Sequence, residues 1–216
     1  MSKDDRCDPT YFDDSCGFMD RVRAQLRLTQ GAEIARRYLA MNAFDGVLPV
    51  LGIIMGGFAS LSFQDPEVIF ETSILAIVAT SFAMLISGIT SSYLTEGAER
   101  KRDIEELERS LLGSLDGSMI VKATRTTTLV VSLINGFSPF GAGLITALPL
   151  MMVFAGFPIG IAFASSVIVA MLLLFILGLF LGNVSKSNML AYGIKTLAAG
   201  ILVVLMIWVF SNATGY

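Results

Sequence analysis

The chain has 216 residues, of which 54% are hydrophobic and only 15% charged, with a formal net charge of −3 and a mean hydropathy of +0.72. Soluble domains carry about a quarter charged residues, so this composition excludes an ordinary soluble domain, a disordered chain and a nucleic-acid-binding protein. The chain contains no histidine, which removes the commonest proton relay, metal ligand and general base.

The amino-terminal segment, residues 1–37, is polar and is predicted to lie in the cytoplasm. It starts with acidic residues and holds no apolar run, so it does not fit a secretory signal peptide. Its two cysteines, Cys7 and Cys16, are too few for a disulfide framework and too far apart for a CxxC motif. Residues 18–37 are predicted to form an amphipathic helix leading into the membrane, with an ordinary surface helix as the simpler interpretation.

Five apolar segments follow, and each is long enough to span about 30 Å of hydrocarbon as a helix. They lie near 38–63, 70–94, 125–153, 158–182 and 190–212, and a Gly/Pro break at 154–158 divides the third from the fourth. The predicted fold is all-α, a polytopic bundle of five transmembrane helices over 38–212 with a short tail at 213–216. An acidic helical loop at 95–124 belongs to this domain, and its first part, 96–112, is predicted to continue the second helix.

The positive charges predict the orientation of these helices in the membrane. All fifteen Lys and Arg lie before the first segment, between the second and third, or in and beside the connection between the fourth and fifth. A five-helix topology places these three regions on one face of the membrane. The excess of Lys and Arg marks the cytoplasmic face, so the amino terminus is predicted inside and the carboxyl terminus outside.

One carboxylate falls inside the first predicted helix. Asp45 lies eight residues beyond Arg37, about 12 Å along a helix, and the next nineteen residues are uncharged. Inserting a central Asp costs about 2.5–3.5 kcal/mol, so such acids usually face a bundle interior, a cavity or an ion path. The alternative is an Asp that reaches back to the cytoplasmic interface or bonds a neighbouring helix.

Asp45 shares its helix face with other polar and small residues at spacings of three and four. The face consists of Asn42, Asp45, Pro49, Gly52 and Gly56. Pro49 has no N–H to donate to the carbonyl of Asp45, so carboxylate and main-chain oxygens are both offered to a cation there. The two glycines form a GxxxG step that would admit a helix of the same or a partner subunit, and plain packing is the simpler interpretation for them.

The second and third predicted helices carry similar polar faces. Met84, Ser87 and Ser91 lie along one face of the second helix, where a thioether could accept a borderline transition metal. Asn135 lies on the third helix, one turn before a proline that frees its carbonyl. We therefore predict a transport path lined by Asn42, Asp45, Pro49, Met84, Ser87, Ser91 and Asn135, suited to a divalent cation or a proton.

An acidic ridge lies on the cytoplasmic continuation of the second helix. It consists of Glu96, Glu99, Asp103 and Glu106, which recur at spacings of three, four and three. Such a ridge could gather cations before transport. The same spacing also fits an ordinary solvated helix, in which Glu96 would pair with Arg100 and Glu105 with Arg109.

These segments together resemble the vacuolar iron transporter family. The first signature is carried by ARRYLAMNAFDGVLPVLGIIMGG at 35–57, and the second helix with its acidic extension by SFAMLISGITSSYLTEGAERKRDIEELE at 81–108. The proline-bearing third helix is similar to SLINGFSPFGAGLITALPL at 132–150, and the last two helices to LFILGLFLGNVSKSNMLAYGIKTLAAG at 174–200. The resemblance covers about residues 33–212 and rests on order and spacing more than on one invariant string.

The resemblance implies a five-helix homodimer that moves ferrous iron or manganese out of the cytosol in exchange for protons. It places the family's pathway aspartate at Asp45 and its metal-collecting residues at Glu96, Glu99, Asp103 and Glu106. This chain departs from the family on the second helix, where Gly88 and Ser91-Ser92-Tyr93 stand in place of Met and Gly-Glu-Tyr, so the family's Met and Glu ligands are missing there and Met84, one turn earlier, is the candidate substitute. Its cytoplasmic insertion is also too short for the three-helix metal-binding module of plant and yeast members.

The leading hypothesis is therefore a transporter and not an enzyme, with Fe²⁺ or Mn²⁺ as its substrate, no permanent cofactor, and protons and the lipid bilayer as its other partners. We expect it in the cell membrane, or in a vacuolar or other organelle membrane of a eukaryote. A non-transporting membrane scaffold that binds a partner protein is the alternative. An intramembrane lipid-modifying enzyme fits less well, because the further aspartates of lipid-headgroup transferases are absent after Asp45-Gly46.

Overall fold

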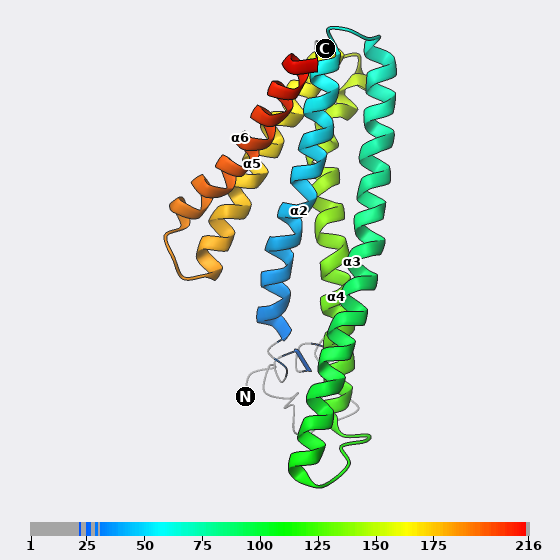
Figure 1. The fold of residues 1–216 in the computed structure, drawn as a ribbon, viewed down its shortest axis with the longest axis vertical. Helices are drawn as coiled ribbons and strands as arrows, with labels where there is room; N and C mark the ends of the chain where they lie inside the picture. Colours follow the sequence, from blue (N-terminus) through cyan, green and yellow to red (C-terminus); the bar gives the residue numbers. More distant parts are fainter. Residues whose placement is uncertain (1–21, 23–24, 27–28, 30, 215–216) are drawn as a thin grey trace, which may run out of the picture. The chain divides into compact units, whose positions relative to one another are not determined.

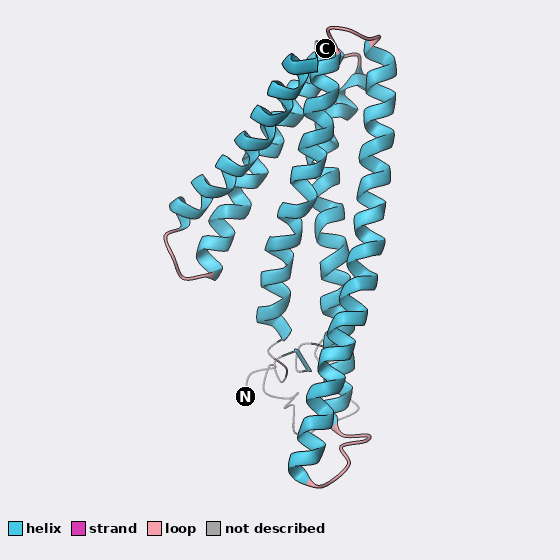
Figure 2. Cartoon of the chain, in the orientation of Figure 1, coloured by secondary structure: helices cyan, strands magenta, loops and turns pink. Residues whose placement is uncertain are grey.

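The computed structural model describes residues 22, 25–26, 29 and 31–214 of the chain. In this part the chain is helical and contains no β-strand, which confirms the predicted all-α class (Figure 1, Figure 2). The elements are α2 (Gly31–Ser60), α3 (Pro66–Leu111), α4 (Met119–Ala147), the 3₁₀ helix η2 (Leu148–Ala155), α5 (Ile159–Val184) and α6 (Met189–Thr214). Cys7, Cys16 and residues 18–21, 23–24, 27–28 and 30 of the predicted amphipathic segment 18–37 lie outside the described residues.

Five of the described helical segments are long and apolar enough to cross a membrane, as the sequence predicts. Their most apolar windows bury only 11–39% of their residues inside the chain, and the mean hydropathy of these windows lies between 1.6 and 2.7. Apolar surface on this scale is stable only against lipid or more protein, because large exposed apolar patches are rare on soluble monomers. The five long, apolar helices therefore indicate a multi-pass membrane protein.

The second spanning helix extends well beyond the thickness of a bilayer. α3 contains 46 residues without interruption, a length of about 69 Å. Its first part is uncharged from 72 to 95, and its second part is rich in Glu, Lys and Arg. The structure thus confirms that the acidic segment 96–112 continues the second helix. Most residues of this segment favour helix, and none is a proline that would break it.

The third span ends differently from the prediction of one helix over 125–153. The α-helix stops at Ala147, and η2 continues the chain to Ala155. Pro149 explains the change, because it lacks the N–H that an α-helix would direct to the carbonyl of Ile145. Gly156 then ends η2 in the left-handed region with a φ of 87°, and Pro158 precedes α5. The predicted break at 154–158 is confirmed.

The described chain divides into two compact units. One joins the chain up to Tyr38 with Gly88–Asn135, and the other joins Leu39–Ser87 with Gly136–Tyr216. The second unit holds the apolar core, where fully buried side chains of α2, α3, η2 and α5 meet; among them are Val50, Ile54, Ile77, Leu150 and Phe163. The polar contacts of the first unit are described with the candidate site.

Glycines bring two pairs of helices of the second unit into close contact. A Cβ on Gly178 of α5 would lie 2.7 Å from the Cα of Gly193 of α6, and one on Gly46 of α2 would lie 2.6 Å from the Cα of Pro139 of α4. Real Cβ atoms do not come so near, so only glycine fits at these crossings. Small residues of this kind let membrane helices pack backbone to backbone, where van der Waals contact replaces the hydrophobic effect.

Candidate functional site

Asp45 lies in the middle of α2, and its side chain is exposed on the surface of the single chain. Its neighbours Ala43, Gly46 and Val47 are buried toward α4 and α5. Successive residues of a helix point about 100° apart, so a helix that buries these positions directs Asp45 away from the core. The carboxylate is therefore presented on the outer face of an apolar helix.

The carboxylate of Asp45 has no partner among the residues that the structure describes: neither a hydrogen bond nor an ion pair reaches it. It borders an open cavity of about 220 Å³ between α2 and the α5–α6 pair. The cavity is lined by Ala40, Met41, Phe44, Asp45, Leu177, Leu181 and Thr196. Asp45 is the one ionisable side chain in this lining. The hydroxyl of Thr196 donates to the carbonyl of Leu174 at 2.9 Å, so its oxygen lone pairs, like the sulfur of Met41, are uncharged donors to a cation there.

The rest of the predicted Asp45 face is also open in the single chain. Asn42 is half-buried, and Pro49 is exposed. A Cβ on Gly52 would meet only Ile207, at 3.9 Å, and one on Gly56 would meet nothing within 4 Å. The GxxxG step is thus not used for close packing within the described part of the chain, and packing against a partner subunit stays a prediction. The close contact is made by Gly46, which the sequence analysis did not single out for packing.

The predicted path residues of α3 and α4 divide between the two units: Met84 and Ser87 belong to the unit of Asp45 but do not line its cavity, and Ser91 and Asn135 belong to the other unit. Met84 is half-buried on α3, and Ser87 and Ser91 are exposed. Asn135 instead fastens α4 to α3, because its Nδ2 donates to the carbonyl of Gly88 at 3.0 Å. The side-chain amide at this position therefore has a structural bond in the first unit.

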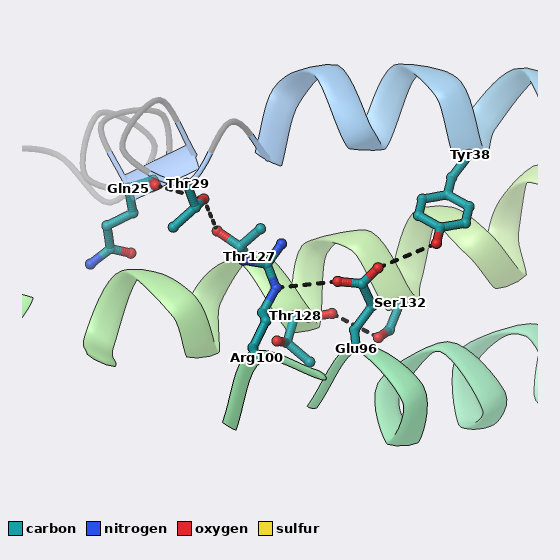
Figure 3. Close-up of polar contacts among 8 residues, drawn as sticks. All are labelled: Gln25, Thr29, Tyr38, Glu96, Arg100, Thr127, Thr128 and Ser132. Carbon is teal, nitrogen blue, oxygen red and sulfur yellow. Dashed lines mark hydrogen bonds and ion pairs between the residues drawn. The ribbon is translucent and has the colours of Figure 1, made fainter. Parts of the chain in front are cut away.

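The first unit contains a buried ionic cluster around Glu96 (Figure 3). Arg100 Nε donates to Glu96 Oε2 at 3.2 Å, and the Tyr38 hydroxyl donates to Glu96 Oε1 at 3.3 Å. The side chains of Arg100 and Glu96 are only 14% and 12% exposed. Both carboxylate oxygens of Glu96 thus accept a hydrogen bond, and the guanidinium of Arg100, one helical turn later, balances its charge. The predicted i,i+4 pair of Glu96 with Arg100 is confirmed.

Hydroxyl contacts in the same unit join the segment before α2 to α4 and satisfy polar groups along both. Thr29 and Thr127 share a hydrogen bond of 2.6 Å, and Thr29 also donates to the carbonyl of Gln25 (Figure 3). On α4, the buried hydroxyl of Ser132 donates to the carbonyl of Thr128 at 2.7 Å. These bonds satisfy polar groups that would otherwise be costly to bury.

The other members of the acidic ridge, Glu99, Asp103 and Glu106, are exposed. No group of three or more acidic side chains placed to hold a metal ion occurs among the described residues. The predicted pair of Glu105 with Arg109 is wrong: Glu105 lies 4.0 Å from Lys101 instead, and both of these side chains are exposed. The single chain thus offers separate carboxylates and no preformed chelate in its described part.

Two parts of the site were missed by the sequence analysis. Tyr38 stands at the start of an apolar segment, where nothing in the sequence links it to a glutamate 58 positions away. Leu177, Leu181 and Thr196 line the Asp45 cavity from α5 and α6. Their sequence signal is weak, because two are ordinary leucines and Thr196 is one polar residue in an apolar run.

Comparison with known proteins found neither a family model nor a solved structure that matches the chain. The chain is 30% identical to an uncharacterized protein, MJ0645, of the archaeon Methanocaldococcus jannaschii. The match spans 188 residues, which are 86% of this chain and 93% of the archaeal protein. The name of that protein assigns it no activity.

Proposed function

This chain belongs to the family of the Methanocaldococcus jannaschii protein, and we propose that it is a transporter that moves Fe²⁺ or Mn²⁺ out of the cytosol in exchange for protons. The proposal rests on residues of this chain and on its resemblance to the vacuolar iron transporters. Three regions would lie on the cytoplasmic face: the amino-terminal segment through the start of α2, the stretch from the charged extension of α3 to the start of α4, and the stretch from the α5–α6 connection to the start of α6. These regions contain all fifteen Lys and Arg.

The observation that carries the proposal is the unpartnered carboxylate of Asp45 within a membrane-spanning helix. Leaving an ionised Asp in hydrocarbon costs about 2.5–3.5 kcal/mol by insertion scales and more by simulation. A helix that retains such a residue without any partner among residues 31–214 needs compensation from another group, such as a bound cation or a second copy of the chain. A cation that visits the cavity beside Asp45 supplies that compensation.

A second copy of the chain would complete the site. The Asp45 face of α2 is open, and Gly52 and Gly56 leave room on it for a helix to approach closely. A homodimer through this face would place the two Asp45 carboxylates near the two-fold axis of the dimer. Their two negative charges would neutralise one divalent cation. The carbonyl of Asp45, freed by Pro49, adds an oxygen of the kind that hard cations prefer.

Two facing carboxylates also provide a way to couple metal to protons. Like charges at short distance favour protonation of at least one of the pair, whereas a bound divalent cation favours both ionised. Protons and metal therefore exclude each other at the same oxygens. A site that opens alternately to the two faces would release metal on the side where protons enter, because each ligand stabilises a different ionic state.

The exposed acids of the α3 extension would concentrate the metal near the cytoplasmic mouth. Glu99, Asp103 and Glu106 have no pairing basic side chain in the described structure, so their field is available to cations. Glu96 is balanced by Arg100 and contributes less. We expect the triple change to Gln, Asn and Gln to lower flux at low metal concentration and to leave the maximal rate unchanged.

The test is metal flux in proteoliposomes with purified protein. We expect Asp45→Asn to abolish Mn²⁺ flux driven by a proton gradient, while the thermal unfolding midpoint of the protein stays the same or rises. Glu33→Gln is the matched control, because it makes the same chemical change at an exposed position of the same helix. Undiminished flux in Asp45→Asn would remove this carboxylate from the mechanism.

A non-transporting scaffold is the second candidate. It is favoured by the finding that residues 31–214 contain no group of three acidic side chains placed to hold a metal. Thermal stabilisation separates the two candidates, since only a metal-binding native state gains stability from added metal. Stabilisation by Fe²⁺, Mn²⁺ or Co²⁺ that disappears in Asp45→Asn supports the transporter, and no stabilisation by any of the three supports the scaffold.

A further inference from the structure

A second cavity, unrelated to Asp45, lies in the first unit between the cytoplasmic end of α3 and the start of α4. Its volume is about 830 Å³. It is lined by apolar residues, by three basic and three acidic side chains, and by small residues. Among them are Tyr93, Leu94, Gly97, Lys101, Arg125 and Leu129. We call it the α3–α4 cleft.

The cleft crosses the level at which hydrocarbon gives way to headgroups. α3 is uncharged from 72 to 95, and α4 becomes uncharged after Arg125. Tyr93, Leu94 and Leu129 lie on the apolar side of this level and are 51%, 65% and 53% exposed. Lys101 lies six residues beyond the apolar run of α3, about 9 Å along the helix. The headgroup layer is roughly 5–8 Å thick, so Lys101 would stand at its aqueous edge.

Gly97 keeps the cleft open. A Cβ built on this residue meets nothing within 4 Å, so no neighbouring helix requires a glycine here. Glycine in a helix costs about 1 kcal/mol relative to alanine. Because Gly97 carries this cost without packing against a described residue, we infer that it leaves space in the cleft for another molecule.

The charges in the cleft follow an order along its length. Nearest the hydrocarbon, Arg125 makes no hydrogen bond or ion pair among the described residues, and Lys101 has only a loose 4.0 Å contact with Glu105. The acidic residues Glu105, Glu108 and Asp116 line the end farther from the membrane. Glu108 is occupied by the amide of Leu115 at 2.7 Å, so Glu105 and Asp116 remain for a ligand.

We propose that the α3–α4 cleft binds a membrane phospholipid with an amine-bearing headgroup such as phosphoethanolamine. Its acyl chains would lie against Leu94 and Leu129, its phosphate between Lys101 and Arg125, and its ammonium toward Glu105 and Asp116. In such a lipid the phosphate is joined to the glycerol and the amine is farther out, which is the order of charge in the cleft. Basic pockets beside membrane helices are known as headgroup sites.

The lipid accounts for the cleft better than a soluble ligand does. A metal ion would need clustered carboxylates, and the described residues contain no such group of three. A peptide would need neither the exposed apolar side chains at the hydrocarbon level nor the basic pair directly above them. The proposal does not depend on metal transport by Asp45, which belongs to the other unit.

Native mass spectrometry of the full chain in a non-ionic detergent tests this site. We expect the first phosphatidylethanolamine to bind about tenfold more tightly than phosphatidylglycerol or phosphatidylcholine. Arg125→Gln should weaken its binding about fivefold, as expected for one basic residue at a phosphate. Asp116→Asn should reduce the preference for phosphatidylethanolamine over phosphatidylglycerol. Arg102→Gln is the control, because it removes an exposed arginine of α3, the other helix of the cleft, that does not line the cleft.

Two further arms make the result decisive. Gly97→Phe should fill the cleft and abolish preferential binding, and Gly97→Ala should keep it while showing that the position tolerates a side chain. Inorganic phosphate in about a hundredfold excess should not displace the lipid; displacement would overturn the lipid assignment and identify a simple phosphate site. Equal lipid binding by the wild type, Gly97→Phe and Arg125→Gln would also overturn it and leave the cleft to a peptide segment.

Discussion

Replacing Gly46 by alanine is expected to destabilise the protein, although the change adds one methyl group to a transmembrane helix. Gly46 lies on α2 against Pro139 of α4. A Cβ there would stand 2.6 Å from the Cα and 2.8 Å from the carbonyl carbon of Pro139, where ordinary contacts begin at 3.4 Å. The neighbouring atoms are backbone, so no side-chain rotation relieves the overlap. The two helices must move apart by most of an ångström.

The size of the effect follows from two opposing terms. Forcing an extra methyl group into a packed core costs about 1–3 kcal/mol. Alanine regains up to about 1 kcal/mol through its higher helix propensity. We therefore expect Gly46→Ala to lower the free energy of unfolding by about 1–2 kcal/mol, and Gly46→Val to lower it further, because the second methyl group cannot be placed without greater separation.

The assay is equilibrium unfolding in mixed micelles with increasing SDS, followed by tryptophan fluorescence of the single Trp208. Gly141→Ala is the matched control, since it makes the same change on the partner helix α4 at a position with nothing within 4 Å. The control should unfold at or above the wild-type SDS fraction. If Gly46→Ala were as stable as Gly141→Ala, α2 and α4 would not cross at Gly46, and the placement of Asp45 on the outer face would be wrong.

Three further changes test other parts of the structure. Glu96→Gln should lower the free energy of unfolding by about 3 kcal/mol in the same SDS assay, because it leaves the mostly buried Arg100 guanidinium without its counter-ion. The double variant with Arg100→Gln should regain most of this loss. Thr196→Val keeps the shape of the side chain but removes its bond to the carbonyl of Leu174, so a loss of only about 0.6 kcal/mol is expected, and a loss above about 2 would contradict this account. Gly56→Leu should leave the unfolding of the single chain unchanged but lower the fraction of dimer seen by light scattering in detergent; an unchanged dimer fraction would exclude this face as the interface.

The helices could be predicted from the sequence because their signals are local. Five apolar runs, the charged extension at 96–112 and the Gly/Pro break at 154–158 are each contained in a short stretch of chain. The face shared by Asn42, Asp45 and Pro49 also follows from helical spacing alone. The end of α4 at Ala147 could also have been predicted, since Pro149 has no N–H for an α-helical bond to the carbonyl of Ile145, but one helix over 125–153 was predicted instead.

The packing of the helices could not be predicted, because spacing does not show which neighbour a face meets. The sequence offered the Gly52–Gly56 step as a packing motif, yet the close contact falls at Gly46, opposite Pro139 of a helix more than ninety residues later. The partner of Glu105 is Lys101 rather than Arg109, although both lie four residues away. The α5–α6 lining of the Asp45 cavity depends on tertiary contacts that no local pattern encodes.

The measurement that tests the central claim most directly is anomalous X-ray scattering from crystals of the full chain soaked with Mn²⁺, compared between the wild type and Asp45→Asn. The account predicts one strong manganese peak between the Asp45 carboxylates of two copies, which is absent in the variant. A wild-type crystal in which Asp45 faces lipid, with neither a second copy nor a manganese peak beside it, would contradict the transport site.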